Sequence, residues 1–226
     1  MARKPPPPPP AYYEPLLYAF ILGRTGERVT SVEDAQIAAE LYGLRISKFL
    51  RKPPLPRVLK TLELIREVNP NPESILEVGC GRGTAMWPMM EALAGTRFYG
   101  ADSYEGRGGD LRAMRDAGVA QIGDGYHLPA QALTGLARAS HDAVLCLEVL
   151  EHLETDRDVE AAAGELLRVS RDLVLVSVPS VKDGNPDHKR LFTAGALRNL
   201  FLRAGAARVE LQEVPKHFVV SVRKNP

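Results

Sequence analysis

The sequence predicts an α/β fold in which a seven-stranded, mostly parallel sheet is doubly wound by helices and its last strand is antiparallel. Three observations predict it. Short apolar runs alternate with helical patterns from about residue 73 onward. The first of these runs enters a glycine-rich turn, Ser74 to Gly83, of the kind that opens a helix. The last two runs, residues 208–211 and 218–222, have no helix between them, so we expect the final strand to be antiparallel.

The strands expected in this sheet are short and apolar, as in parallel sheets whose two faces are both covered. A helix that Thr84 can cap follows the glycine turn and reaches about Ala94. Further helices are expected from Asp110 to Ala117, around residues 159–167, and from Thr193 to Ala204. Strands after the turn are expected at residues 97–102, 119–122, 142–147, 173–178, 208–211 and 218–222.

The first 72 residues differ from the sheet-forming part. Residues 1–10 contain six consecutive prolines, which predict a disordered proline-rich tail. Residues 11–72 carry helical patterns, and we expect a helical extension that acts as a lid or substrate region. Residues 73–226 then form the main domain. The extension also holds a run of basic residues without an acid, which indicates a solvated helix face or, alternatively, contact with a phosphate-bearing substrate. These residues are Arg45, Lys48, Arg51, Lys52, Arg57 and Lys60.

The composition gives no sign of a membrane-spanning, nucleic-acid-binding or disulfide-rich protein. The 226 residues are 45% hydrophobic and 25% charged with a net charge of +1, which is ordinary for a globular protein and gives no whole-chain signal for nucleic acid. No run approaches the roughly 18 apolar residues of a membrane span, so we expect a cytoplasmic protein without a membrane partner. Cys80 and Cys146 are expected to be reduced core residues. Nothing in the sequence indicates the oligomeric state.

The glycine turn and an acid that follows it predict a nucleotide-like cofactor. Gly79, Gly81 and Gly83 carry no Cβ, so the backbone can approach a ligand closely. Asp102 ends the second expected strand, 19 positions beyond Gly83. A ribose-binding carboxylate needs that offset, because one helix must cross the sheet before the next strand returns to the same edge. Asp124 lies just beyond the third expected strand. Each acid has a simpler alternative, a helix cap or a surface charge.

From Ser74 to Arg223 the chain resembles the class I S-adenosylmethionine-dependent methyltransferases. The resemblance rests on Ile75 to Gly83, Asp102, Gly123-Asp124 and Leu147 to Leu153. Thr84 stands where a nicotinamide-binding fingerprint expects glycine, which makes an oxidoreductase the weaker interpretation. The resemblance implies a Rossmann-like fold, a transferase activity and S-adenosylmethionine as the cofactor. The cofactor-binding residues that it implies are Glu77, Gly79, Cys80, Gly81, Gly83, Asp102, Ser103, Asp124, Gly125 and Leu147.

The resemblance also implies individual roles. Glu77 would hold the turn or reach the amino end of the cofactor through water. Asp102 would accept hydrogen bonds from both ribose hydroxyls, which suits a carboxylate. Asp124 would accept from the adenine amine, with Gly125 permitting close approach. Leu147 would lie beneath the sulfonium.

Methyl transfer is a direct displacement at a carbon that the positive sulfur already activates, so the protein contributes mainly alignment and shielding from water. A base is needed only if the nucleophile starts protonated. The candidates are Glu148, His152 and His188, which the strand order brings to one edge of the sheet. If the segment after Glu148 is helical, then Glu148, Glu151 and His152 share one helix face.

The same residues also permit a metal site. Glu148, Glu151, His152 and His188 resemble the ligand set of the metal-dependent enzymes that methylate the 2′-hydroxyl at the 3′ end of small RNAs. We do not favour a metal, because many methyltransferases carry a similar motif without one and no RNA-binding domain is recognisable. The predicted function is methyl transfer to oxygen or nitrogen of a small molecule. The alternatives are a metal-dependent RNA 2′-O-methyltransferase and a non-catalytic, cofactor-binding interaction module.

Overall fold

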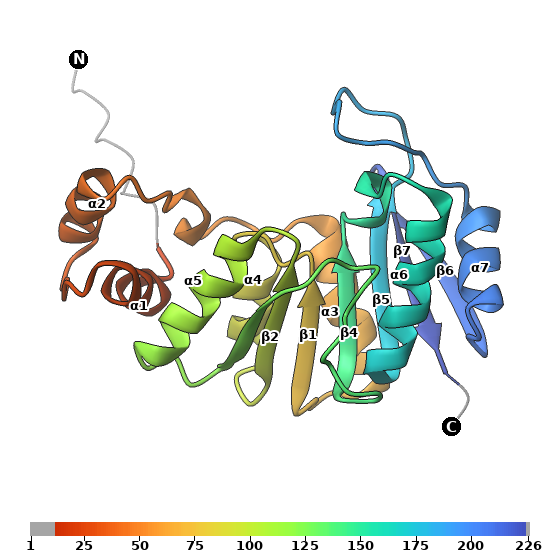
Figure 1. The fold of residues 1–226 in the computed structure, drawn as a ribbon, viewed down its shortest axis with the longest axis horizontal. Coiled ribbons are helices and arrows are strands. Elements are labelled where there is room, and N and C mark those ends of the chain that lie inside the picture. The colour runs from red at the N-terminus through yellow and green to blue at the C-terminus, as the bar shows by residue number, and fades with distance from the viewer. Residues whose placement is uncertain (1–11, 225–226) are drawn as a thin grey trace, which may run out of the picture.

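The computed structural model of this chain describes residues 12–224, so the expected proline-rich tail at residues 1–10 lies outside it. Seven strands form one sheet in the order β3-β2-β1-β4-β5-β7-β6 (Figure 1). β7 pairs antiparallel with both β5 and β6, and the other pairs are parallel, which confirms the predicted fold class. The strands are β1 (Ser74–Val78), β2 (Arg97–Asp102), β3 (Ile122–His127), β4 (His141–Leu147), β5 (Ser170–Pro179), β6 (Arg208–Val214) and β7 (His217–Arg223).

Successive side chains of each strand point to opposite faces of the sheet, so a hydrophobic core lies on each face. Ile75 of β1 packs into a cluster with α3 (Pro56–Val68), α4 (Met86–Ala92) and α5 (Glu105–Asp116). Its neighbour Leu76 packs into the opposite cluster with α6 (Asp156–Val169) and α7 (Ala194–Arg203). All seven residues of β4 are buried, as expected for a central strand that is covered on both sides.

The N-terminal helices extend one of these cores beyond the β3 edge of the sheet. α1 (Glu14–Thr25) packs against α5, and Figure 1 shows α1 and α2 (Val32–Leu41) at that end of the molecule. A Cβ at Gly23 of α1 would lie 2.4 Å from the carbonyl oxygen of Ala113, so the two helices require glycine at their contact. In the short 3-10 helix η1 (Ser47–Phe49), the ring of Phe49 stacks on Trp87 with the ring centroids 5.6 Å apart.

The third strand lies later in the chain than predicted. It was expected at residues 119–122, but β3 runs from Ile122 to His127 and contains Gly123, Asp124 and Gly125. Glycine and aspartate are poor strand formers, so sequence reasoning ends the strand too early. The glycines are retained because a Cβ at Gly123 would strike the ring of Tyr99, and one at Gly125 would strike the backbone of Gly108 in α5.

The helix after the glycine turn departs from expectation, because α4 begins at Met86 and has Ala85 at its N-cap, so Thr84 does not cap it. Residues 128–140 connect β3 to β4 without a helix. This connection is fixed by Arg168 of α6, whose guanidinium donates to the carbonyl oxygens of Leu133 and Leu136 at 2.9 and 2.7 Å. Within residues 12–224, no helix is long and apolar enough to cross a membrane.

Candidate functional site

The ends of β1, β2 and β4 surround a cavity of about 380 Å³ at the carboxyl edge of the sheet. Gly79 and Asp102 line one side, and Glu148 and His152 line another. Ser103 and the segment from Leu128 to Gln131 complete much of the wall. The volume is within the range of about 300 to 1,000 Å³ that small-molecule and cofactor sites occupy.

Asp102 is held in place by the backbone. Its Oδ2 accepts a hydrogen bond from the amide of Gly81 at 2.9 Å, and its Oδ1 accepts one from the amide of Tyr104 at 2.9 Å. A carboxylate has about four acceptor positions, so each oxygen keeps capacity for a further donor. The geometry therefore fits a carboxylate that receives two hydroxyl groups of a ribose.

The three glycines of the turn all have left-handed backbone conformations, with φ of 74° at Gly79, 54° at Gly81 and 81° at Gly83. Two of them also make room for side chains of the protein. A Cβ at Gly79 would lie 2.2 Å from Val149, and one at Gly83 would lie 2.0 Å from the ring of Trp87. At Gly81 nothing lies closer than 4.0 Å. The glycine pattern is thus required by the shape and packing of the turn as well as by any ligand.

Glu77 is buried beneath the turn with 3% of its surface exposed. Its Oε2 has no hydrogen-bond partner among residues 12–224. Burial, together with the nearby charge of Asp102, raises the pKa of Glu77 to about 8. A positively charged amino group at the turn would supply the missing partner. This unpartnered oxygen fits the amino end of S-adenosylmethionine.

Three other predicted cofactor residues have mixed placements. Ser103 is exposed and lines the cavity, while its carbonyl oxygen lies 2.9 Å from Nε2 of His127. Leu147 is buried at the end of β4. Cys80 is a free, buried cysteine whose sulfur would lie 2.8 Å from a Cβ at Gly100, so its side chain fills the space above that glycine. The structure supports a packing role for Cys80.

Asp124 and Gly125 are not at the cavity. Asp102 pairs with His127 across the sheet, and Asp124 lies three residues earlier, opposite Tyr99. The carboxylate of Asp124 forms an ion pair with Arg115 of α5 at 2.8 Å. Gly125 permits the close approach of α5 to the strand. The expectation that Asp124 lies just beyond the third strand is wrong, because β3 continues to His127, and contact of Asp124 and Gly125 with adenine stays a prediction.

Glu148 is the centre of a polar network that sequence reasoning missed. Its backbone is left-handed, with φ of 60°, which is unusual for a residue with a side chain. Its Oε1 accepts from the hydroxyl of Ser177 at 2.8 Å and lies 3.6 Å from Nε of Arg57. Its Oε2 lies 3.0 Å from Nε2 of His217. The sequence could have indicated His217, because it directly precedes the predicted antiparallel last strand. Such a strand starts at the edge of the sheet where the parallel strands end.

His217 is oriented by acceptors on both sides. Its Nδ1 lies 3.0 Å from the carbonyl oxygen of Pro215, and its Nε2 faces Glu148. Each ring nitrogen therefore faces an oxygen atom, and the remaining contacts of Glu148 are made by Ser177 and Arg57.

Glu151, His152 and His188 form a separate cluster, in which one potential ligand atom from each lies within 4.8 Å of the others. Glu151 is fully buried, and neither carboxylate oxygen has a partner among the described residues. Burial raises the pKa of Glu151 to about 8. The imidazole rings of the two histidines meet edge to face with their centroids 4.8 Å apart. Three side chains that could each supply a metal-ligand atom are therefore close together.

Glu148 does not join that cluster, contrary to the expectation of one shared helix face. The segment after it forms only a single 3-10 turn, Leu150–His152, and the left-handed backbone of Glu148 turns its carboxylate towards Ser177 and His217. The four residues considered as a metal set are therefore divided between two neighbouring groups.

Comparisons with known proteins agree with this geometry. Residues 76–173 match a family model described as a methyltransferase domain. No match was found among curated proteins. Among solved structures, the 1,6-didemethyltoxoflavin-N1-methyltransferase of Burkholderia thailandensis is similar over 94% of this chain and 91% of its own, with 19% identity and a TM-score of 0.59.

Two further structures are informative. Magnesium protoporphyrin IX methyltransferase from Synechocystis is similar over 95% of this chain and 99% of its own, with 16% identity and a TM-score of 0.55. The small RNA methyltransferase HEN1 has 20% identity and a TM-score of 0.61, and the likeness covers 78% of this chain but 26% of that protein. At these identities the structural likenesses show a common fold.

Proposed function

We propose that this chain is a class I S-adenosylmethionine-dependent methyltransferase and that it transfers a methyl group to an oxygen or nitrogen atom of a small molecule. The observation that carries the proposal is the cavity at the carboxyl edge, where Asp102 lies on one wall and Glu148 and His152 lie on another. One wall suits the cofactor and the other suits an acceptor.

Residues of the turn and of β2 would hold the cofactor. Asp102 would bind the ribose hydroxyls, and Glu77 would balance the amino group from below the turn. When bound, S-adenosylmethionine supplies a methyl group on a positively charged sulfur. The role of the protein is then to align an acceptor atom with that methyl group and to exclude water.

Glu148 is the best-placed group to receive a proton from an acceptor. It lines the cavity, and its contacts with Ser177, Arg57 and His217 fix its orientation. His152 also lines the cavity, whereas His188 lies behind it, against Asp183 at 2.9 Å. We therefore assign proton transfer to Glu148 and orientation of the acceptor to His152, with His188 holding the ring of His152.

A small acceptor is supported by the extent of the likenesses. Two neighbours whose likeness covers more than 90% of both chains are named for 1,6-didemethyltoxoflavin and a porphyrin, both small molecules. The likeness to the RNA enzyme covers about a quarter of that protein. The non-catalytic interaction module is not favoured for a chain of this superfamily.

A metal-dependent RNA 2′-O-methyltransferase is the second candidate. The observation that favours it is the cluster of Glu151, His152 and His188, because the buried and unpartnered carboxylate of Glu151 would be satisfied by a cation. A divalent metal held there would polarise a ribose hydroxyl. Glu148 belongs to the neighbouring network and would not be one of the metal ligands.

The test is methyl transfer from labelled S-adenosylmethionine to two panels of acceptors, with and without a chelator. One panel holds small phenols, carboxylic acids and amines, and the other holds short RNA duplexes. We expect label in small molecules, insensitive to the chelator. Asp102→Ala should lose this activity, and Asp172→Ala, an exposed aspartate at the opposite end of the sheet, should keep it. Chelator-sensitive transfer to RNA ends alone would reject the first candidate in favour of the second.

A further inference from the structure

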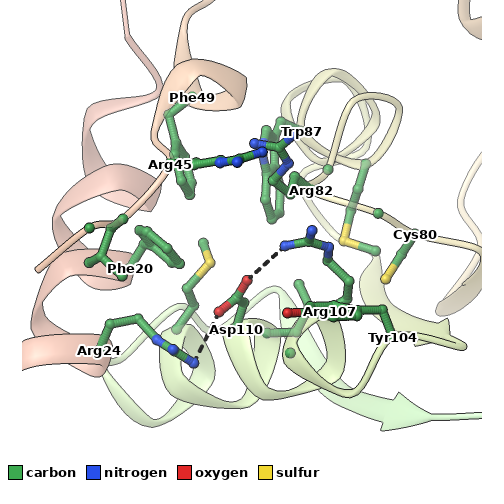
Figure 2. Close-up of a pocket in the computed structure, with 18 residues that line it drawn as sticks. Phe20, Arg24, Arg45, Phe49, Cys80, Arg82, Trp87, Tyr104, Arg107 and Asp110 are labelled. Carbon is green, nitrogen blue, oxygen red and sulfur yellow. Dashed lines mark ion pairs between the residues drawn. The ribbon is translucent and has the colours of Figure 1, made fainter. Parts of the chain in front are cut away.

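A second cavity, of about 410 Å³, lies on the other side of the glycine turn between α1, η1, α4 and α5 (Figure 2). It has no lining residue in common with the cofactor cavity. Its wall includes Gly81 and Gly83, whereas Gly79 and Asp102 line the first cavity. The turn therefore separates two spaces.

The second cavity is strongly basic. Arg24, Arg45, Arg82 and Arg107 line it, and Asp110 is the acidic residue on its wall. Asp110 already pairs with Arg24 at 3.2 Å and with Arg107 at 3.7 Å, as the dashed lines of Figure 2 show. Arg45 and Arg82 form no ion pair within the described part of the chain. Two guanidinium groups thus remain for an anion.

The cavity also has aromatic walls. Phe49 stacks on Trp87 and lies 5.1 Å from Phe20 between ring centroids, so three packed and largely buried aromatic rings line one wall. On the facing wall Tyr104 is 63% exposed, and the guanidinium of Arg107 lies 4.8 Å from its ring centroid. In Figure 2 Arg45 extends across the opening towards Trp87. Planar surfaces and free guanidinium groups therefore border one space.

We propose that this second cavity binds an organic anion in which a phosphate or carboxylate group is attached to an aromatic ring. Guanidinium groups bind such anions through paired hydrogen bonds, and aromatic side chains bind a ring by stacking. The ligand is an additional one, because the glycine turn separates it from the cofactor. The proposal does not depend on which acceptor is methylated.

Trp87 provides a direct measurement, because it is the chain's single tryptophan and it lines the second cavity. Phenyl phosphate should change its fluorescence in a saturable way. Inorganic phosphate lacks the ring and benzyl alcohol lacks the charge, so each should bind at least about tenfold more weakly. The affinity for phenyl phosphate should fall as salt is added. Equal binding of phosphate and phenyl phosphate would overturn the role of the aromatic walls.

The double variant Arg45→Gln, Arg82→Gln should weaken phenyl phosphate binding at least about tenfold, since each charged hydrogen bond contributes on the order of that factor. Arg203→Gln, on the far helix α7, is the matched control and should leave binding unchanged. The proposal fails if phenyl phosphate gives no saturable change, or if the double variant and the control bind it equally.

Competition separates this proposal from the methyltransferase function. S-adenosylhomocysteine should not displace phenyl phosphate, and Asp102→Ala should lose S-adenosylhomocysteine while it retains phenyl phosphate. Competitive displacement by S-adenosylhomocysteine would show that the second cavity is part of the cofactor site and would overturn the assignment. Loss of cofactor binding alone would affect only the proposed enzymatic function.

Discussion

Replacing Glu77 by glutamine should increase the stability of the protein at pH 8 and change it little near pH 4.5. Burial, reinforced by the charge of Asp102, raises the pKa of this carboxyl from 4.5 to about 8 in the folded protein. Between these values the folded chain holds a proton that the unfolded chain has released. The wild-type protein therefore loses stability as the pH rises from 4.5 to 8, and Glu77→Gln removes that loss.

The magnitude follows from the interval between the two pKa values. At 1.36 kcal/mol per unit, Glu77 costs the folded state about 4 kcal/mol by pH 8. His141 acts in the opposite direction at lower pH, because burial lowers its pKa from 6.5 to about 4 and its contribution is lost as the pH falls through that range. The window from pH 6.5 to 8 lies above the range of His141, and Glu77 contributes about 2 kcal/mol there. Glu151, whose pKa burial also raises to about 8, adds the same loss to the wild type and to Glu77→Gln, so the difference between the two proteins reports Glu77.

Urea unfolding followed by circular dichroism at pH 6.5 and pH 8 measures this difference. Wild type should lose about 2 kcal/mol more between the two values than Glu77→Gln does. Glu67→Gln, an exposed glutamate on α3, is the control and should follow the wild type. Parallel curves for wild type and Glu77→Gln would refute the inference that Glu77 is protonated in the folded protein at neutral pH.

Three further substitutions test other parts of the structure. Thr155→Ala removes the hydrogen bonds that the Thr155 hydroxyl makes with the amide and the carboxylate of Asp158 at the start of α6 and should lower the free energy of unfolding by about 1 kcal/mol in urea; an unchanged value would show that this cap contributes nothing. Gly83→Ala should lower it by several kcal/mol and alter tryptophan fluorescence, because the new Cβ would strike Trp87 at a left-handed position; a wild-type melting curve would contradict this. His217→Ala should lower kcat by about tenfold to a hundredfold and leave the Kd for S-adenosylhomocysteine unchanged, and an unchanged kcat would remove Glu148 and its partner from proton transfer.

Local patterns predicted the elements whose boundaries are set by nearby residues. β2 has the predicted bounds, Arg97–Asp102, because an apolar run ends there on an acid. β3 was misplaced because Gly123, Asp124 and Gly125 are weak strand formers that are kept in the sheet by Tyr99 and α5. Strand propensity depends on the residue type alone, whereas the extent of β3 depends on the residues that pack against it in the folded protein.

In the candidate site, too, features set by local sequence were predictable and features that join distant elements were not. Asp102 and the glycine turn were predictable, because both follow strands of one local unit. The network around Glu148 was not, since it joins Arg57, Ser177 and His217 from α3, β5 and β7, and the left-handed backbone of Glu148 breaks the helical spacing assumed for its neighbours. The basic cavity likewise combines α1, α4 and α5, which no local pattern brings together.

The most direct test of the central claim is calorimetric titration of the purified chain with S-adenosylhomocysteine. We expect one molecule bound per chain with a Kd in the micromolar range, weakened at least about a hundredfold in Asp102→Ala because two charged hydrogen bonds are lost. Asp172→Ala should match the wild type. If the wild type does not bind, or if Asp102→Ala binds as tightly as the wild type, the assignment of this edge of the sheet to S-adenosylmethionine is wrong.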